Sequence, residues 1–335
     1  MKVGVIGCGA IARRAHLPAY RRLGVDIMGV ADLREDRAMS CAKKFHAKKC
    51  FTQYEDLLEE ELDLVSICTP HSTHARIAVD AAKHGINVLV EKPLATNLVD
   101  ADRIIRACRD SAVQLCVMHN LRLVPCIPEA KNHVENGRIG RIVSMHVIGR
   151  SFMPMSWTDS TWFYSKWGLL EDIGSHLLDV INFICNSPLK DVKVIARDFT
   201  NSMGFLSHIQ TILLFENKVC ADLDLSWISG SFESSLRILG TAGTLDVDIR
   251  NNYLREMHGY VTPIDDISSA FRKLHRTAKA VINKSYFRGS LVYHQTIIKA
   301  FIESILNRTP PPISGKQGRA VVALMDSIKK AKELV

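Results

Sequence analysis

The sequence predicts an α/β protein of two domains: an N-terminal Rossmann domain at residues 1–122, and a C-terminal α+β domain at residues 123–335 with a large, mostly antiparallel, open-faced sheet. The chain has 335 residues, which is too long for one ordinary core and suits two domains. Its first 120 residues alternate short apolar runs with amphipathic stretches, the pattern of βαβ units in a parallel sheet. After Pro125 and Pro128 this rhythm gives way to strict two-residue alternation, which is typical of a sheet with one covered face.

The first half contains apolar runs that suit strands buried on both faces, because they are rich in Val and Ile and carry few charges. They lie at residues 2–6, 26–31, 62–68, 87–90 and 113–118. Helical patterns separate them at residues 75–84 and 99–111. In the second of these helices, Ala101, Ile104, Ile105 and Cys108 form an i, i+3, i+4, i+7 stripe.

The second half contains segments of alternating polarity. From Val219 to Trp227, every second side chain is apolar and the intervening ones are mostly polar, so one face of this strand is buried. Similar segments lie at residues 141–150, 192–199, 209–215, 235–239, 244–249 and 253–261. Helices are expected at about 128–136 and 169–184.

Cysteine usage and charge exclude several classes of protein. The nine cysteines are scattered and never spaced as C-x-x-C, so we expect neither a disulfide framework nor a metal site. The net charge of +8 is spread along the chain without a nucleic-acid-binding signature, and no nucleic-acid partner is expected. No apolar run approaches the ~20 residues that cross a bilayer, and the first residues do not resemble a signal peptide. These features favour a soluble, cytoplasmic protein.

A glycine-rich turn follows the first predicted strand and predicts a dinucleotide site. Its sequence is Gly7-Cys8-Gly9-Ala10-Ile11-Ala12. The first glycine allows a tight turn, the second allows a pyrophosphate to approach the backbone, and Ala12 allows close packing of helix and strand. The N-terminus of the following helix would supply N–H groups and partial positive charge to the phosphates.

An acidic residue at the end of the second predicted strand favours NAD over NADP. Asp32 lies at the position from which a carboxylate accepts hydrogen bonds from the adenosine ribose hydroxyls and repels a 2′-phosphate. Arg34 and Arg37 keep NADP as the alternative, because either guanidinium can contact a phosphate or stack on adenine. A structural role for Asp32 as a helix N-cap is the other interpretation.

Further motifs follow the later strands in order. They are Thr69-Pro70-His71-Ser72-Thr73-His74, Glu91-Lys92-Pro93, the segment from Asn120 to Pro125, and Gly168-Leu169-Leu170-Glu171-Asp172-Ile173-Gly174-Ser175-His176. Together with the glycine turn, this ordered set resembles the Gfo/Idh/MocA family, the glucose–fructose oxidoreductase and inositol dehydrogenase type. The resemblance covers nearly the whole chain.

The resemblance implies a Rossmann domain followed by a sheet domain that binds substrate and forms contacts in a homodimer or homotetramer. It also implies cofactor contacts at Thr69, Pro70, His71, His74, Glu91, Lys92 and Asn120. The implied activity is hydride transfer between a nicotinamide cofactor and a secondary alcohol of a sugar, polyol or sugar nucleotide.

Lys92, Asp172 and His176 are the catalytic candidates. Lys92 follows a parallel strand, at the sheet edge where ligands bind, and a partly desolvated ammonium there can hydrogen-bond the reacting oxygen. Asp172 and His176 are four residues apart and share a face of the predicted helix, so the carboxylate can orient the imidazole for proton transfer. Either Lys92 or His176 can be the formal base, and a surface lysine with a helix-surface ion pair is the structural alternative.

Other side chains are candidates for the substrate side. Arg122 and Trp162 are assigned to substrate binding, and Trp157 and Tyr164 belong to the same aromatic stretch, for which core packing is the alternative.

Residues 267–288 form a basic amphipathic segment. Its apolar side chains are Ile267, Phe271, Leu274, Ala278, Val281 and Ile282, and its basic ones are Arg272, Lys273, His275, Arg276 and Lys279. We expect the apolar face to pack on the domain and the basic face to be solvated. The alternative is contact with an anionic sugar nucleotide or an acidic membrane surface.

Two other functions remain open from the sequence. One is a redox-neutral, glycosidase-like enzyme that oxidises and re-reduces its substrate with bound NAD. The other is a non-catalytic NAD-binding regulator.

Overall fold

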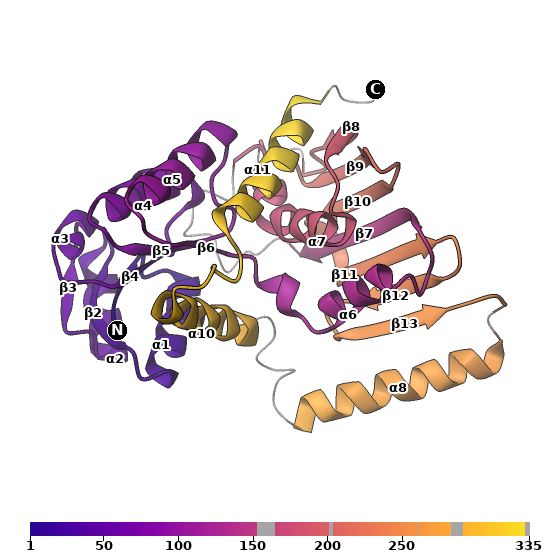
Figure 1. Ribbon diagram of the computed structural model, residues 1–335, viewed down its shortest axis with the longest axis horizontal. Helices are drawn as coiled ribbons and strands as arrows, with labels where there is room; N and C mark the ends of the chain where they lie inside the picture. The colour runs from indigo at the N-terminus through magenta and orange to yellow at the C-terminus, as the bar shows by residue number, and fades with distance from the viewer. Residues whose placement is uncertain (153–164, 201–203, 261, 283–290, 332–335) are drawn as a thin grey trace. The chain divides into compact units, whose positions relative to one another are not determined.

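The computed structural model describes residues 1–152, 165–200, 204–260, 262–282 and 291–331, without the side chains of residues 279–281. The chain forms two compact units (Figure 1), which are described separately. The first unit comprises Met1–Asn120 and Leu291–Ala323, and the second comprises Leu121–Ser290 and Leu324–Val335.

The first unit contains a six-stranded parallel sheet in the order β3-β2-β1-β4-β5-β6. This is the strand order of a dinucleotide-binding Rossmann fold, and the predicted fold class is confirmed. The strands are β1 (Lys2–Ile6), β2 (Asp26–Ala31), β3 (Lys49–Phe51), β4 (Leu64–Ile67), β5 (Asn87–Glu91) and β6 (Leu115–Met118). The sequence did not predict β3, because three residues are too few to show a period.

Helices cover both faces of this sheet. They are α1 (Leu17–Arg22), α2 (Glu35–Phe45), α3 (Tyr54–Leu58), α4 (His74–Lys83) and α5 (Leu98–Asp110). Figure 1 shows α4 and α5 on one side of β4 and β5, with α1 on the other. Val5, Ile67 and Leu89 are fully buried, as expected for strands covered on both faces.

The first unit is discontinuous in the sequence. It includes α10 (Leu291–Asn307) and the first half of α11 (Gly315–Lys330), which lie far from residue 122 along the chain. Helix α10 buries Ile297, Ile298 and Phe301, and the Val117 N–H donates to the carbonyl oxygen of Ile313. The membership of the unit therefore differs from the predicted range 1–122, because this apolar helix face packs beside α1.

The second unit contains a seven-stranded sheet in the order β13-β12-β11-β7-β10-β9-β8, which is antiparallel except for the pairing of β10 with β7. Its strands are β7 (Ile142–Phe152), β8 (Leu189–Arg197), β9 (His208–Phe215), β10 (Cys220–Ser226), β11 (Ile228–Gly240), β12 (Thr244–Asp248) and β13 (Tyr253–Met257). Helices α6 (Cys126–Glu135) and α7 (Ser175–Cys185) pack against it. The alternation in β10 is confirmed, because Ala221, Leu223 and Leu225 are fully buried.

Helix α8 (Pro263–Ile282) corrects one expectation about the basic segment. Its apolar side chains were expected to pack on the domain, but Ile267, Phe271 and Leu274 are 57%, 68% and 66% exposed. Lys273 and Arg276 instead form ion pairs with Asp248 and Glu129 of the same unit. Periodicity defines two faces of a helix, but it does not say which of them packs against the rest of the protein. Residues 283–288 of the segment lie outside the described residues.

Among the described residues, no helix combines the length and the apolar character that crossing a bilayer requires.

Candidate active site

The glycine turn follows β1 and has the geometry that the sequence predicts. Gly7 has φ +89°, and its N–H donates to the carbonyl oxygen of Ala31 over 2.8 Å. A Cβ at Gly7 would lie 2.7 Å from the carbonyl oxygen of Cys68, so only glycine fits here. A Cβ at Gly9 would meet no atom within 4 Å. The space beside Gly9 is therefore open in this structure, and it suits the close approach of a pyrophosphate to the backbone.

Asp32 lies at the end of β2, next to this turn. Its Oδ2 accepts a hydrogen bond from the Cys8 N–H over 2.8 Å, and its Oδ1 accepts one from the Arg34 N–H over 2.9 Å. The carboxylate is only half-buried, so it retains a solvent-facing side. These contacts hold the carboxylate beside the phosphate-binding turn, where a ribose hydroxyl can donate to it. The residues present therefore fit NAD.

The two arginines near Asp32 differ in exposure. Arg34 is exposed and donates from Nε and Nη2 to Asp36 over 3.2 and 2.8 Å, whereas Arg37 is half-buried in α2. An exposed ion pair of this kind contributes little to stability, so the Arg34 guanidinium can be diverted to a ligand at small cost.

The segment from Thr69 to His74 turns from β4 into α4 through a 3₁₀ turn at His71–Thr73. The Thr73 hydroxyl donates to Thr69 Oγ1 over 2.7 Å. Both ring nitrogens of the buried His74 face carbonyl oxygens, those of Pro93 at 2.9 Å and Thr69 at 3.0 Å. Two carbonyl acceptors favour the imidazolium, but burial dominates and lowers the pKa of His74 to about 4. A neutral ring has one N–H and donates to only one of these oxygens. Donation from Nδ1 to Pro93, the shorter contact, ties the start of α4 to the loop after β5.

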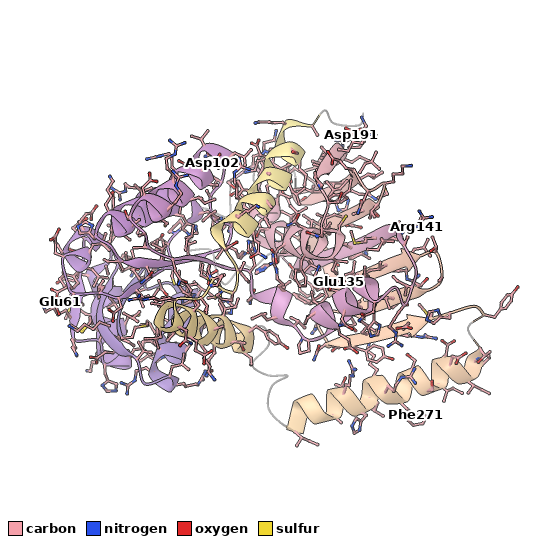
Figure 2. All side chains as sticks on the ribbon, in the orientation of Figure 1. Glu61, Asp102, Glu135, Arg141, Asp191 and Phe271 are labelled. Atoms are coloured by element: carbon pink, nitrogen blue, oxygen red, sulfur yellow. The ribbon has the colours of Figure 1, made fainter. Side chains whose placement is uncertain are left out.

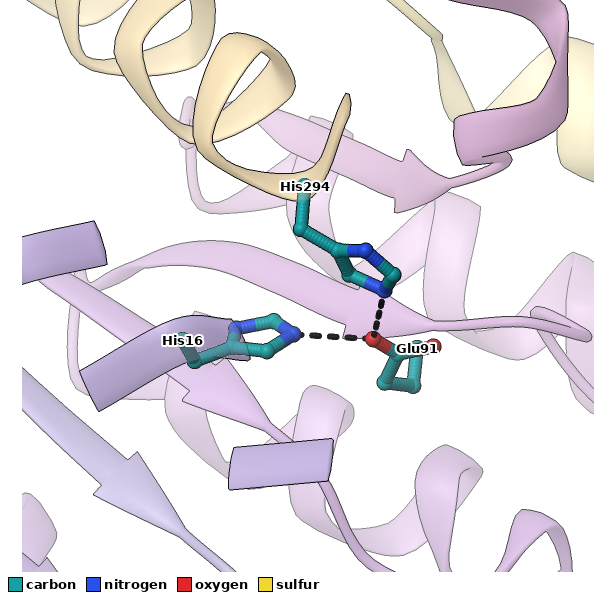
Figure 3. Close-up of side chains that lie close together, drawn as sticks. All are labelled: His16, Glu91 and His294. Carbon is teal, nitrogen blue, oxygen red and sulfur yellow. Dashed lines mark hydrogen bonds and ion pairs between the residues drawn. The ribbon is translucent and has the colours of Figure 1, made fainter. Parts of the chain in front are cut away.

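Glu91, the last residue of β5, is the centre of a buried hydrogen-bond network (Figure 3). Its Oε1 lies 2.8 Å from Nε2 of His16 and 3.5 Å from Nε2 of His294. Its Oε2 accepts a hydrogen bond from the Lys92 N–H over 3.2 Å. Burial alone would raise the pKa of Glu91, but the two imidazoles outweigh it and hold that pKa well below its usual range. The carboxylate is therefore charged at neutral pH.

The contacts around the network assign its protons. Asn120 Nδ2 can only donate, so Nδ1 of His294, 3.2 Å away, accepts and Nε2 of His294 carries the proton. Tyr20 and Ser66 hydroxyls lie 2.5 Å apart, and Ser66 Oγ lies 3.1 Å from Nδ1 of His16. Burial lowers the pKa of His16 despite the carboxylate beside it, so this ring is neutral. Hydrogen bonds then run in one direction, from Tyr20 through Ser66 and His16 to Glu91.

His16, Glu91 and His294 also form a set of three metal-ligand types whose atoms lie within 4.8 Å of one another. Their interactions with one another and with Ser66, Lys92 and Asn120 account for this arrangement without further ligands. The network anchors the carboxyl end of β5, and Lys92 follows directly.

Lys92 and Asn120 are the buried candidates at this edge of the sheet. Lys92 is 9% exposed and Asn120 is 1% exposed, and they follow β5 and β6. The glycine turn, Asp32 and Thr69 follow β1, β2 and β4, and the carboxyl ends of parallel strands meet at one edge. The structure thus gathers the predicted cofactor residues of the first unit at the ligand-binding edge of its sheet.

Asp172 and His176 belong to the second unit and are both half-buried. Asp172 lies in a π-helical turn (Leu170–Gly174), and His176 lies in the first turn of α7. The sequence predicted one regular helix over 169–184, because periodicity does not reveal a single widened turn. Such turns within α-helices are frequent at functional sites. Whether Asp172 and His176 meet Lys92 stays a prediction.

Of the two residues assigned to substrate binding alone, the structure describes Arg122 but not Trp162. Arg122 forms a buried, two-pronged ion pair with Asp179, and its guanidinium lies 4.8 Å from the ring centroid of Phe183. Its contact with substrate stays a prediction. Trp162 lies outside the described residues, as do Trp157 and Tyr164.

Sequence reasoning missed His16 and His294 as members of the site region. Both lie on helices, and His294 lies beside the apolar positions Ile297 and Ile298 of α10. A histidine on an apolar helix face was the available signal, because a buried imidazole requires a polar partner.

Comparison with protein families identifies both units. Residues 1–119 match the model described as "Oxidoreductase family, NAD-binding Rossmann fold", and residues 127–246 match the "GFO/IDH/MocA C-terminal domain".

Curated relatives match along nearly the whole chain. The chain is 25% identical to the myo-inositol 2-dehydrogenase of Thermotoga maritima, over 99% of this chain and 96% of that protein. It is 26% identical to the D-apiose dehydrogenase of Paraburkholderia graminis, over 97% of this chain and 86% of that protein.

Solved structures share the fold. The WlbA dehydrogenase from Bordetella pertussis, in complex with NADH and UDP-GlcNAcA, has a TM-score of 0.82 and 22% identity, covering 98% of this chain and 95% of that one. The UDP-N-acetylglucosamine 3-dehydrogenase GnnA from Acidithiobacillus ferrooxidans has a TM-score of 0.77 and 23% identity, covering 99% and 97%.

Proposed function

Because the chain belongs to the Gfo/Idh/MocA family of oxidoreductases, we propose that it transfers hydride between NAD and a secondary alcohol of a sugar, polyol or sugar nucleotide. The observation that carries this proposal is the edge of the first sheet, where the open glycine turn, Asp32 and Lys92 follow neighbouring parallel strands. Curated relatives that are named dehydrogenases of a polyol and a sugar support the substrate class.

Residues of the first unit would bind the cofactor. The Gly7–Gly9 turn and the first N–H groups of the following helix hold the pyrophosphate, and Asp32 accepts hydrogen bonds from the adenosine ribose. NAD, when bound, supplies the hydride acceptor. The Asp32 carboxylate, already fixed by the Cys8 and Arg34 N–H groups, disfavours a 2′-phosphate.

Three side chains would carry the proton chemistry. The buried Lys92 ammonium hydrogen-bonds the reacting oxygen and stabilises negative charge that develops on it. His176 accepts the hydroxyl proton, and Asp172 orients the imidazole. The aromatic stretch that includes Trp162, together with Arg122, would contact the substrate.

The same proposal includes a homodimer or homotetramer and a cytoplasmic location. Apolar side chains on the sheet of the second unit support self-association, since Val143, Ile212 and Leu239 are 45%, 44% and 42% exposed. The nine cysteines are all free, which suits a reducing compartment.

The experiment that tests the function combines binding with turnover. Purified protein is titrated with NAD and NADP by calorimetry, then incubated with NAD and polyols, free sugars, sugar acids and sugar nucleotides while nicotinamide absorbance is followed. We expect NAD binding and reduction with one substrate class. Lys92→Ala and His176→Ala should abolish turnover and retain NAD binding, whereas the exposed Lys83→Ala should leave both unchanged.

Other outcomes would overturn the proposal. NAD that stays bound through purification, with substrate consumed but no net NADH, would indicate the redox-neutral enzyme. NAD binding without turnover of any substrate class would indicate the regulator. Tighter binding of NADP than NAD would contradict the role of Asp32.

A further inference from the structure

His294 lies in the first turn of α10, and its side chain is buried. Figure 3 shows its imidazole approaching Glu91 from α10, while His16 reaches the same carboxylate oxygen from the segment that follows the glycine turn. Burying a polar side chain costs stability unless hydrogen-bond partners satisfy it. The proposed chemistry gives His294 no role, so its contacts need an explanation of their own.

The two ring nitrogens of His294 contact the ends of two different strands. Nε2 lies 3.5 Å from Oε1 of Glu91, the last residue of β5, and Nδ1 lies 3.2 Å from Nδ2 of Asn120, which follows β6. Strands β5 and β6 are neighbours in the sheet, and Glu91 is paired with Met118. One rigid ring therefore sets the spacing between two segments at the ligand-binding edge.

The ring has opposite roles at its two nitrogens. Asn120 Nδ2 can only donate, so Nδ1 of His294 accepts, and Nε2 carries a proton that points to the Glu91 carboxylate. A neutral imidazole combines one acceptor and one donor at fixed positions. Lysine and arginine side chains offer only donors, and a carboxylate offers only acceptors, so none of them could replace this ring.

Both contacts lead to residues at the edge of the sheet where the cofactor would bind. Oε2 of the Glu91 carboxylate accepts from the Lys92 N–H over 3.2 Å, so the orientation of this carboxylate fixes the backbone from which Lys92 projects. The Asn120 amide contacts His294 directly. All four side chains are buried, and close-packed surroundings leave them little room to adopt another position.

Helix α10 is held in the first unit by contacts that do not involve His294. The apolar side of α10, which includes Ile297 and Phe301, is fully buried. Further along the chain, Arg319 of α11 forms a two-pronged ion pair with Asp102, which lies on α5 (Figure 2). An apolar residue would therefore suffice at position 294 if packing were its only task.

We propose that His294 is a positioning residue for the proposed hydride transfer: it holds Lys92 through Glu91 and holds Asn120 directly, and so sets their spacing at the cofactor edge. This rests on the proposed function for what Lys92 does in the reaction, but the contacts themselves do not depend on the substrate. Misplacing a reacting group by about 1 Å can lower a rate by about 10²-fold, so the loss of either contact should be measurable.

Three substitutions separate the contacts of His294. The side-chain oxygen of His294→Asn reaches as far from Cβ as Nδ1 does, so it can accept from Asn120, but no group reaches Glu91. The side-chain NH₂ of His294→Gln reaches as far as Nε2, so it can donate to Glu91, but Asn120 loses its acceptor. His294→Leu removes both contacts and keeps an apolar side chain of similar size.

The variants are compared by kcat at saturating NAD, by the Kd for NAD from calorimetry, and by melting temperature. His294→Asn should lower kcat by about ten- to hundredfold and leave the Kd unchanged, because Lys92 loses its support. His294→Gln should raise the Kd for NAD by about fivefold and leave kcat nearly unchanged, as expected when one hydrogen bond is lost at the cofactor edge. His294→Leu should show both effects.

His84 provides the matched controls. It is an exposed histidine of the same unit that follows α4 and precedes β5, so it lies away from the edge at which β5 ends. His84→Asn and His84→Gln should leave both kcat and the Kd for NAD unchanged.

A double-mutant cycle tests whether His294 acts through Asn120. In an Asn120→Ala background, the effect of His294→Gln on the Kd for NAD should disappear, because the side chain through which it acts is absent. Additive effects on the Kd would overturn this half of the proposal. Crystal structures of the wild type and His294→Asn test the other half, since Lys92 should be displaced in the variant; an unmoved Lys92 would overturn it.

Two results would overturn the proposal as a whole. One is a His294→Leu protein with the kcat and Kd of the wild type, which would reduce His294 to packing. The other is a set of variants in which kcat and Kd change together, in proportion to the loss of melting temperature, which would indicate a general loss of structure. A wild type that binds NAD but turns over no substrate would instead contradict the proposed function, and the cycle and the crystal structures would then decide the role of His294.

Discussion

Replacing Glu91 by glutamine tests the buried network most directly. The carboxylate accepts from His16 and His294 at one oxygen and from the Lys92 N–H at the other. A hydrogen bond to a charged group contributes about 1.5–3 kcal/mol and a neutral one about 0.5–1.5 kcal/mol. The two imidazole bonds would therefore weaken by about 1 kcal/mol each.

The hydrogen bond from the Lys92 N–H to Oε2 adds a further loss of stability. If the Glu91→Gln carbonyl oxygen faces the imidazoles, the amide NH₂ faces the Lys92 N–H, and a buried donor is left without an acceptor at a cost of about 1–3 kcal/mol. Relief from burying a charge offsets part of this sum. We expect a net loss of roughly 2–4 kcal/mol, which lowers the melting temperature of a unit of this size by about 2–4 °C per kcal/mol.

Differential scanning calorimetry at pH 7 measures this shift. Glu61→Gln is the control, because Glu61 is 85% exposed and its partner is the exposed Lys2, so its melting temperature should not change measurably. A Glu91→Gln protein that melts within 2 °C of the wild type would refute the assignment of Glu91 as a charged acceptor of three hydrogen bonds. The difference in stability between the wild type and Glu91→Gln should also decrease in acid, because the pKa of Glu91 is depressed in the folded state. Its contribution is present above the unfolded pKa and is lost as the pH falls through the folded one.

The other predictions concern the glycine turn, the buried ion pair and the pH dependence of stability. Gly7→Ala should lower the melting temperature and weaken NAD binding, because its Cβ would clash with the backbone at Cys68. Gly9→Ala should leave the melting temperature unchanged, because its Cβ meets no protein atom, and it should abolish NAD binding. Equal effects of the two variants on the melting temperature would contradict this reasoning. Asp179→Asn should lower the free energy of unfolding, measured by urea denaturation, by about 3–5 kcal/mol, because it leaves the Arg122 guanidinium buried beside a neutral group. A decrease of less than about 1 kcal/mol would show that this ion pair is not buried in solution. Burial lowers the pKa of His74 to about 4 in the folded protein. As the pH falls below about 6.5, the imidazole therefore becomes protonated in the unfolded chain but not in the folded protein. The free energy of unfolding should fall by about 2 kcal/mol between pH 7 and pH 5 as a result. His74→Asn should remove this decrease in the free energy of unfolding between pH 7 and pH 5. An unchanged dependence of that free energy on pH would contradict a neutral His74 in the folded protein.

The fold of the first unit followed from local patterns. Strands rich in Val and Ile, such as Lys2–Ile6, reveal themselves by their composition, and the glycine turn with Asp32 fixes their connection. Because parallel strands align their carboxyl ends, the positions of Lys92 and Asn120 at one sheet edge also followed from the order of the motifs.

What the sequence could not provide was the set of long-range partners. His294 reaches Glu91 from about 200 residues further along the chain, and no local period encodes that pairing. The periodicity of the sequence predicted the two faces of α8. It could not predict that Lys273 faces the sheet, because this depends on its hydrogen bond to Asp248 of β12. In each case a tertiary contact decided what periodicity had left open.

The discontinuity of the first unit has a consequence for the order of events during synthesis. Chains emerge from the ribosome N-terminus first, so the strands and the glycine turn are available long before α10. Until His294 has been translated, Glu91 lacks one of its two imidazole donors and Asn120 lacks the ring that accepts from it. Nascent chains arrested before residue 291 should therefore remain sensitive to protease in the Rossmann region. Resistance should appear only after α10 has left the exit tunnel, when the second unit has already been synthesised.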